Sequence, residues 1–466
     1  MNKDFLNLLS EFWKVGHLFK FLTKLLVRIY RSFLVRFLRG TMIGYPSEIR
    51  PLTKNIKKVT EPEIHHPREC LSDISKIKLA TDYLAYDKWP DWEMNFDSHE
   101  QYVSLHRWNW LLRAATDDRD KIDYHWGISM ARSWLSSMGV VPSGDASESY
   151  TIGERISNFC LFSREINGSW NEIPNDIQEA LKYKAKYLSA RLEFLAGGFT
   201  GNHIINNARA LIFAGHCTNT SELLDLSRSL LKSNLPILID KDGFLREGSS
   251  HYQFLFTRWI LEIRLIASEK DDYKTLSIIE PFIRKLIDAC DFFLVSEDKQ
   301  KALPLFGDIS PDCEPDWLVD LTRSKLSIYQ SNDRSQSLSG WATLFQDTEK
   351  ELQTIKRKKS KDNFRSNSDW IRLDFQDWTA IWHMETFKSN PTATHSHNDF
   401  GSLVLFRNGK EVIIDSGRLD YENTDISKYG LHHTSHTNIS IDGYPLTLSA
   451  RDYLFPSLYV YAKNSV

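Results

Sequence analysis

The sequence lacks the cysteine pattern of a disulfide-stapled protein or a zinc knuckle. Its 466 residues contain five cysteines, an odd number, and no C-x-x-C pair occurs. Disulfide frameworks and cysteine zinc sites depend on evenly numbered or closely spaced cysteines. We therefore expect buried free thiols at Cys70, Cys160, Cys217, Cys290 and Cys313.

A long uninterrupted apolar run is also missing. Residues 5–39 are rich in Leu, Phe and Val, but seven lysines and arginines interrupt them. A membrane-spanning helix needs about 20 apolar residues, and a secretory signal needs an unbroken apolar centre of about 7–15. The sequence therefore predicts neither a transmembrane helix nor a signal peptide.

The basic residues of this segment follow a helical stripe. At helical spacing, Lys20, Lys24, Arg28 and Arg31 share one face, with apolar side chains elsewhere. Such a helix packs on the protein's own core with a solvated basic edge, or lies on an anionic membrane surface. Both interpretations stay open, and residues 5–39 are a candidate peripheral membrane contact.

A large excess of positive or negative charge is also missing. The net charge of −3 gives no overall case for a nucleic-acid partner. What the chain has is aromatic residues, at 12% with 14 Trp and 18 Tyr. Aromatic rings stack on sugars, and they equally fill large helical cores. The length suggests two or three domains.

Helical periodicity dominates the first three quarters of the chain. Apolar residues recur at i, i+3, i+4 and i+7 in several segments, which predicts successive antiparallel helices and an array or toroid. The clearest of these segments are residues 100–115, 175–197, 203–217, 220–233 and 251–268.

The pattern changes after a charged stretch. Residues 346–369 are rich in charge, Ser and Asn, and are interpreted as a linker. Short segments with a period of two then follow, and Asn408-Gly409 is a strong hairpin signal. We expect four regions: a basic amphipathic segment at 1–60, a helical domain at 61–345, the linker at 346–369 and a β domain at 370–466.

Two polar clusters lie at expected helix starts. Asn202 and His203 open one helix, where Asn202 is a candidate N-cap and the helix dipole would also favour an anion. In the second cluster, Tyr252 follows Glu247 and opens a helix. It is either a core aromatic residue or a catalytic phenol.

A third cluster combines histidines with an aspartate. His395 and His397 would share one face if their segment is extended, and Asp415 and His436 end and begin later strands. Two histidines and one aspartate are common zinc ligands, although a polar strand end would look similar. A simple hairpin pairs Asp415 with Ser402, so the chain must bend back for His397 to reach such a metal.

These clusters resemble the heparinase II/III-like polysaccharide lyases and their alginate-lyase relatives. The similarity extends over roughly residues 95–445 and rests on motifs in a fixed order: GNHIINNARAL, DGFLREGSSHYQ, LFGDISPD, HSHNDFGSLVLFRNGKEVIIDSG and SHTNISIDG. The resemblance implies an (α/α) toroid followed by an antiparallel β-sandwich, with the cleft between them. Relatives usually continue further, so the sandwich is expected to be short or truncated.

The family chemistry is β-elimination at a uronic acid in an acidic polysaccharide. By resemblance, Asn202, His203 and His395 neutralise the carboxylate, which makes the C5 proton acidic. Tyr252 is the acid, or acid and base in turn. Tyr421 is the candidate second tyrosine that supplies the base, with Tyr429 as its alternative.

The resemblance also implies supporting residues. One structural zinc per chain would be held by His397, Asp415 and His436 and would fix the loop that bears His395. Gln253 stands where many relatives have a histidine. Residues expected to contact or assist at the sugar are Arg155, Glu247, His251, Arg258 and Asn206.

Other functions stay open from the sequence. An inverting glycoside hydrolase would use paired carboxylates, with Glu247, Asp242 and Asp308 as candidates. A non-catalytic relative would bind acidic glycans without turnover. The family context suggests bacterial surface polysaccharide, in the cytoplasm or at the membrane periphery, with the periplasm as an alternative. The oligomeric state is not indicated.

Overall fold

The computed structural model describes most of the two expected domains. It covers Leu52 and residues 60–67, 74–194, 200–297, 300–329, 337–345, 363–367, 369–384, 395–422, 424–441 and 444–445. The basic segment 5–39, Cys70 and most of the expected linker lie outside these ranges. Across the described ranges, no helix is long and apolar enough to cross a membrane.

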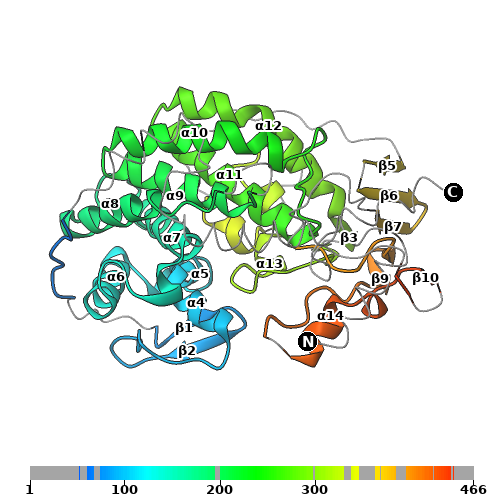
Figure 1. The fold of residues 1–466 in the computed structure, drawn as a ribbon, viewed down its shortest axis with the longest axis horizontal. Coiled ribbons are helices and arrows are strands. Elements are labelled where there is room, and N and C mark those ends of the chain that lie inside the picture. The colour runs from blue at the N-terminus through cyan, green and yellow to red at the C-terminus, as the bar shows by residue number, and fades with distance from the viewer. Residues whose placement is uncertain are drawn as a thin grey trace, which may run out of the picture.

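Helices form the larger part of the molecule (Figure 1). They are α4 (His99–Arg107), α5 (Asn109–Asp117), α6 (Tyr124–Met138), α7 (Ser149–Asn167), α8 (Asn175–Ser189), α9 (His203–Cys217), α10 (Ser221–Leu238), α11 (Ser250–Glu269), α12 (Tyr273–Phe293) and the short α13 (Pro315–Leu318). A small hairpin of β1 (Lys76–Leu79) and β2 (Asp82–Ala85) precedes them.

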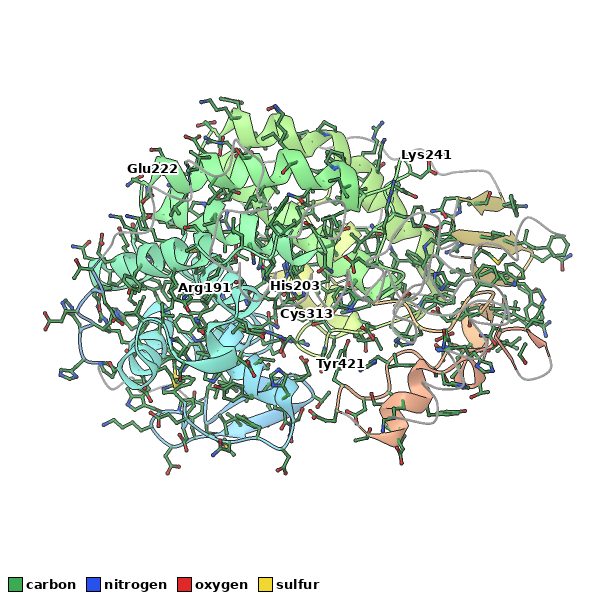
Figure 2. The ribbon with its side chains drawn as sticks, in the orientation of Figure 1. Arg191, His203, Glu222, Lys241, Cys313 and Tyr421 are labelled. Carbon is green, nitrogen blue, oxygen red and sulfur yellow. The ribbon has the colours of Figure 1, made fainter. Side chains whose placement is uncertain are left out.

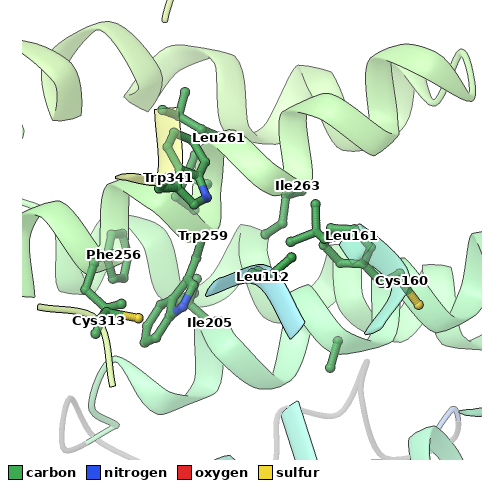
Figure 3. Packing of buried hydrophobic residues seen from close by; sticks show 14 of the residues in the cluster. Leu112, Cys160, Leu161, Ile205, Phe256, Trp259, Leu261, Ile263, Cys313 and Trp341 are labelled. Carbon is green, nitrogen blue, oxygen red and sulfur yellow. The ribbon is translucent and has the colours of Figure 1, made fainter. Parts of the chain in front are cut away.

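Sequence neighbours pack as pairs, as the periodicity predicted. α9 packs against α7, α8, α10 and α11, and α11 packs against α12. Their apolar faces meet in one core, part of which surrounds Trp259 and Trp341 (Figure 3). Cys160, Cys217, Cys290 and Cys313 are buried free thiols, which confirms the prediction for those four.

The single helix expected over residues 100–115 is divided into α4 and α5 in the structure. Residues 100–115 have continuous helical periodicity, but Trp108 adopts a left-handed backbone with φ of 60°. The chain therefore turns between α4 and α5, and Trp108 is buried against Trp134 and Phe159. Packing of this indole overrides the local helical preference, because a single left-handed residue costs far less than the burial of a tryptophan gains.

The β domain contains one antiparallel five-stranded sheet in the order β5–β6–β7–β8–β9. Its strands are β5 (Phe364–Ser366), β6 (Trp370–Phe375), β7 (Trp378–His383), β8 (Leu403–Arg407) and β9 (Lys410–Ile413). The expected hairpin at Asn408-Gly409 is confirmed: both residues have positive φ, and Arg407 pairs with Lys410. The first strand, β5, falls inside the stretch interpreted as a linker.

The sheet has two unlike faces. Trp370 and Arg372 point toward the helices, where Trp370 packs on Phe293 and the Arg372 guanidinium donates to the Phe292 and Leu294 carbonyls. The opposite face carries Leu373 and Phe375, and Phe375 is 58% exposed. Beyond the sheet lie α14 (Asp425–Leu431) and the short pair β10 (Ser440–Ile441) and β11 (Tyr444–Pro445).

The loop that follows β3 (Val295–Glu297) and β4 (Gln300–Ala302) contacts both the helical domain and the β domain. Gly307 lies at its tightest point, with φ of 69°. A Cβ atom there would lie 2.5 Å from both the Gly248 and the His395 carbonyl oxygens. Three distant segments of the chain therefore cross at this glycine, and only glycine fits between them.

Candidate active site

The start of α9 presents polar groups that are not used for capping. The Asn202 side chain caps no backbone N–H, and its Nδ2 is buried without a hydrogen-bond partner. Its backbone N–H donates to Glu247 Oε1 at 3.1 Å. A buried amide with an unused donor is unfavourable by itself, so Asn202 is suited to an anionic ligand.

His203 extends the same helix start. Its Nδ1 lies 2.9 Å from Glu193 Oε1, and its ring lies 4.5 Å from that of Tyr150. Burial acts to lower the pKa of His203, but the Glu193 carboxylate outweighs it and the pKa is raised. The ring is therefore more readily cationic than a free histidine, next to the unused Asn202 amide.

The start of α11 meets the β domain at Tyr252. Ser249 caps α11 by accepting from the Tyr252 backbone N–H, and the same Oγ donates to the Asp308 carbonyl. The Tyr252 ring stacks on His395 with centroids 3.6 Å apart and planes at 17°. The candidate phenol of the toroid and the candidate histidine of the β domain are thus in direct contact.

Asp308 fixes both histidines of the HSH motif. Its Oδ2 lies 3.0 Å from His395 Nδ1, and its Oδ1 lies 3.0 Å from His397 Nε2. Because a carboxylate accepts, these nitrogens donate, and His395 Nε2 is left facing Glu247 Oε2 at 3.8 Å. The spacing of His395 and His397 suggested an extended strand, but this segment is not a strand in the structure. The two rings converge through a shared carboxylate in a loop.

Of the two tyrosines proposed as the base, Tyr421 interacts with Tyr252, whereas Tyr429 is exposed. The Tyr421 hydroxyl donates to the Ile309 carbonyl, and a hydrogen bond with Tyr421 acts on the Tyr252 phenol. Tyr429 lies on α14 and is 53% exposed. Burial, with Asp308 nearby, raises the pKa of Tyr252 well above its ordinary value, and burial likewise raises that of Tyr421. Both phenols are protonated at neutral pH.

The residues expected to bind zinc lie close together. The His397 and His436 ring centroids are 5.4 Å apart, and Asp415 accepts from His436 Nδ1 at 3.0 Å. His397 Nδ1 and His436 Nε2 are buried without hydrogen-bond partners. Asp415 also accepts from the Ser402 hydroxyl. The strand register differs from that of the simple hairpin, because it shifts between Leu405 and Phe406. No group of three His, Cys, Asp or Glu side chains in the described part of the chain is arranged to hold a metal ion.

Two bare imidazole nitrogens beside a carboxylate are nevertheless the donor types that zinc prefers. The chemistry of the donor set therefore suits zinc, while the present side-chain arrangement directs Asp415 to His436.

Several residues expected at the sugar lie in the protein interior. The Arg155 guanidinium donates to the His106 and Ala146 carbonyls. Asn206 bonds Arg209 and the Tyr150 carbonyl, and Arg258 bonds Glu154 and Cys313. All three are 0% exposed. The structure therefore brings none of them to the stacked pair.

His251 and Gln253 flank Tyr252 and have structural contacts. His251 Nε2 donates to the Cys313 carbonyl, and its Nδ1 accepts from the Ser310 N–H. Burial lowers the pKa of His251 to about 4, which is consistent with a neutral ring. Gln253 bonds Leu245 and Gly243. Both side chains hold the loops that position Tyr252.

The sequence did not indicate two neighbours of the site. Glu193, which orients His203, lies before α9 in the sequence and belongs to no recognisable motif. Arg418 lies over the Tyr421 ring at 4.5 Å, and no spacing pattern in the sequence distinguishes it from other arginines. Figure 2 labels His203, Cys313 and Tyr421 in the region where the helices meet the β domain.

Comparison with known proteins identifies the C-terminal part. Residues 357–459 match the family model Heparinase II/III-like, C-terminal. No curated protein sequence matches the chain. Among solved structures, the crystal structure of heparinase III aligns with a TM-score of 0.53 and 17% identity, over 88% of this chain and 72% of that chain.

Two further structures are similar at lower scores. The heparinase III gene product BT4657 has a TM-score of 0.49 and 16% identity, over 86% of this chain and 67% of that chain. Heparan sulfate lyase HepC from Pedobacter heparinus has a TM-score of 0.48 and 16% identity, over 86% and 66%. This chain thus spans about two thirds of the length of these two proteins.

These findings confirm the resemblance and the fold class. The helical domain followed by an antiparallel sheet is the toroid-plus-sandwich arrangement that the motifs implied, and heparinase III shares it. At 17% identity the likeness to heparinase III establishes the fold alone.

Proposed function

We propose that this chain, whose C-terminal part is a heparinase II/III-like C-terminal domain, is a polysaccharide lyase that cleaves a uronic-acid glycan by β-elimination. The observation that carries the proposal is the stacking of Tyr252 on His395. It places one candidate catalytic residue from each domain in contact, with the Tyr421 hydroxyl alongside. The solved relatives named heparinase III and heparan sulfate lyase support the same class of substrate.

The first chemical requirement is neutralisation of the uronic carboxylate. Asn202 Nδ2 is a buried donor without a partner, and the raised pKa of His203 favours its cationic form. His395 Nε2 is the remaining nitrogen of a ring that Asp308 holds through Nδ1. Asn202 and His203 would stabilise the negative charge that develops on the carboxylate as the C5 proton leaves. His395 Nε2 donates only in the doubly protonated ring, because Nδ1 carries the proton of the neutral form.

The second requirement is proton transfer. A phenol with a raised pKa is protonated at neutral pH, so Tyr252 is suited to protonate the departing glycosidic oxygen. Tyr421 is the proposed base. Its hydroxyl donates to the Ile309 carbonyl, so Tyr421 would first have to break that bond and lose its own proton to solvent before it accepts the C5 proton.

The test is the appearance of a product with a conjugated double bond. The purified chain is incubated with uronic-acid polysaccharides, and ultraviolet absorbance is followed. We expect Tyr252→Phe to lower kcat by about 10²–10⁴-fold, the usual contribution of a general acid. The exposed Tyr429→Phe is the matched control and should retain activity. New reducing ends without absorbance would indicate hydrolysis and contradict the proposal.

Two of the carboxylates of the hydrolase alternative are less well placed. Glu247 and Asp308 are both 0% exposed. Asp308 is engaged by two histidines, and Glu247 accepts the Asn202 backbone N–H. This burial favours supporting roles for both.

The source of the glycan is proposed to be a bacterial surface polysaccharide.

We also propose one structural zinc held by His397, Asp415 and His436. The metal would fix the loop that bears His395 and need not contact the sugar. Metal content per chain is the measurement, and we expect about one zinc, lost in His436→Ala but retained in the exposed control His125→Ala. Folded wild-type protein without zinc would contradict the assignment.

A further inference from the structure

Arg418 has an unusual environment for a buried cation. Its side chain is 9% exposed, and its Nε and Nη1 atoms are buried without hydrogen-bond partners. The closest carboxylate oxygen is Asp308 Oδ1, 3.6 Å from Nη1, beyond an ordinary hydrogen bond. A buried guanidinium with unused N–H groups is costly unless a ligand completes it.

The neighbours of Arg418 leave its N–H groups available. Both Asp308 oxygens are already bound by His395 and His397. The Tyr421 ring offers its face, with the guanidinium 4.5 Å from the centroid, and this contact uses no N–H. Tyr421 in turn interacts with Tyr252, so a single side chain separates Arg418 from the proposed acid.

Other buried arginines near the site have carboxylate partners within 3.4 Å. Arg107 pairs with Asp312 and Glu100. Arg258 pairs with Glu154 and Glu262, each at 3.0 Å. Arg418 therefore differs from these guanidiniums in its capacity to accept a new anion.

We propose that Arg418 binds a second oxyanion of the substrate, on a sugar next to the one that reacts. The inference rests on the proposed function, because Asn202, His203 and His395 already serve the reacting carboxylate. The planar fork of arginine matches a carboxylate or a sulfate ester through two parallel hydrogen bonds. The preferred substrate is therefore a glycan with negative charge on adjacent sugars.

Steady-state kinetics of Arg418→Gln test this on three polymers. They are a uronic acid–hexosamine polymer without sulfate, its sulfated form, and a polyuronate. A charged hydrogen bond contributes about 1.5–3 kcal/mol, so KM should rise about 10–100-fold for the polymer that carries the recognised anion. The increase for the polymer without an adjacent anion should be smaller. Whether the sulfated polymer or the polyuronate is affected identifies the anion.

Two variants control this experiment. Arg407→Gln removes a guanidinium that is 60% exposed and paired with Asp377, and it should behave as wild type. Arg418→Lys keeps the charge but loses the fork, and it should recover part of the affinity. Equal effects of Arg418→Gln on all three polymers, or none, would overturn the proposal.

A second measurement does not depend on turnover. Inorganic sulfate at constant ionic strength is added to wild type, Arg418→Gln and Arg407→Gln, and the midpoint of thermal unfolding is recorded. Sulfate stabilises proteins in general, so the difference between variants is the result. We expect a smaller shift only for Arg418→Gln. If no polymer is cleaved but this difference is found, the proposed function fails and the anion site stands; equal shifts overturn a sulfate site.

Discussion

Glu154 in the toroid and Asp308 at the junction of the domains are both buried carboxylates, yet their partners differ in kind. Glu154 accepts from the guanidiniums of Arg209 and Arg258, whose charge is permanent. Asp308 accepts from the imidazoles of His395 and His397, and His395 stacks on Tyr252. The first arrangement suits a fixed interior, and the second suits a site that positions functional side chains.

The rest of each region follows the same division. Around Glu154, the indoles of Trp259 and Trp341 donate to Glu154 and Glu262, so the toroid pairs its buried charges with its own side chains. Around Asp308, His397, His436 and Asn202 keep buried nitrogens without partners. We infer that stability is concentrated in the toroid network and that ligand binding is concentrated at the junction.

The largest expected effect is on the toroid network. Glu154→Gln leaves the buried Arg209 and Arg258 with too little negative charge, which we expect to lower the free energy of unfolding by about 3–5 kcal/mol. Denaturant unfolding measures it. Glu179→Gln, on an exposed ion pair of α8, is the control and should stay within about 0.5 kcal/mol. Equal stability of the two variants would contradict the concentration of stability in the toroid network.

The next effect is on activity. Asp308→Asn keeps the shape but loses one acceptor for the two imidazoles, so we expect kcat to fall about 10–100-fold, as for other residues that orient a functional histidine. Its unfolding free energy should change less than that of Glu154→Gln, because the amide oxygen of asparagine can still accept from one of the two imidazoles. Asp377→Asn, on an exposed pair with Arg407, serves as the control. A loss of stability without a loss of kcat would assign Asp308 to the structural class.

The smallest effect concerns the outer face of the sheet. Phe375→Ser, at a 58% exposed position, should change the free energy of unfolding by no more than about 0.5 kcal/mol. Ile381→Ala, on the inner face at 0% exposure, should lower it by about 2–5 kcal/mol. Denaturant unfolding compares the two. A large effect of Phe375→Ser would mean that the outer face is covered in solution.

Local signals predicted the elements better than their contacts. The periodicity of α9 and α11 and the Asn-Gly turn before β9 depend on neighbouring residues, so the sequence indicated them. The break at Trp108 depends on burial of one indole against α6 and α7, which no local pattern encodes. The strand β5 was hidden by its charged surroundings.

The candidate site divides in the same way. Motif order identified Tyr252, His395 and Tyr421, and the structure brings them together. Asp308 was considered only as a hydrolase carboxylate, because its two histidine partners lie 87 and 89 residues away. Arg258 was expected at the sugar from its closeness in sequence to Tyr252, but six residues along α11 direct it into the interior.

The crossing at Gly307 has a consequence for the order of folding. Chains emerge from the ribosome N-terminus first, and domains generally fold as units. The toroid, with Asn202, His203 and Tyr252, can assemble while residue 395 is still being synthesised. The His395 carbonyl accepts from the Asp308 N–H at 2.8 Å beside Gly307, and we infer that this contact forms last because residue 395 is synthesised last of the three segments. Synthesis of the last quarter of the chain therefore acts as the step that turns a folded scaffold into a complete site.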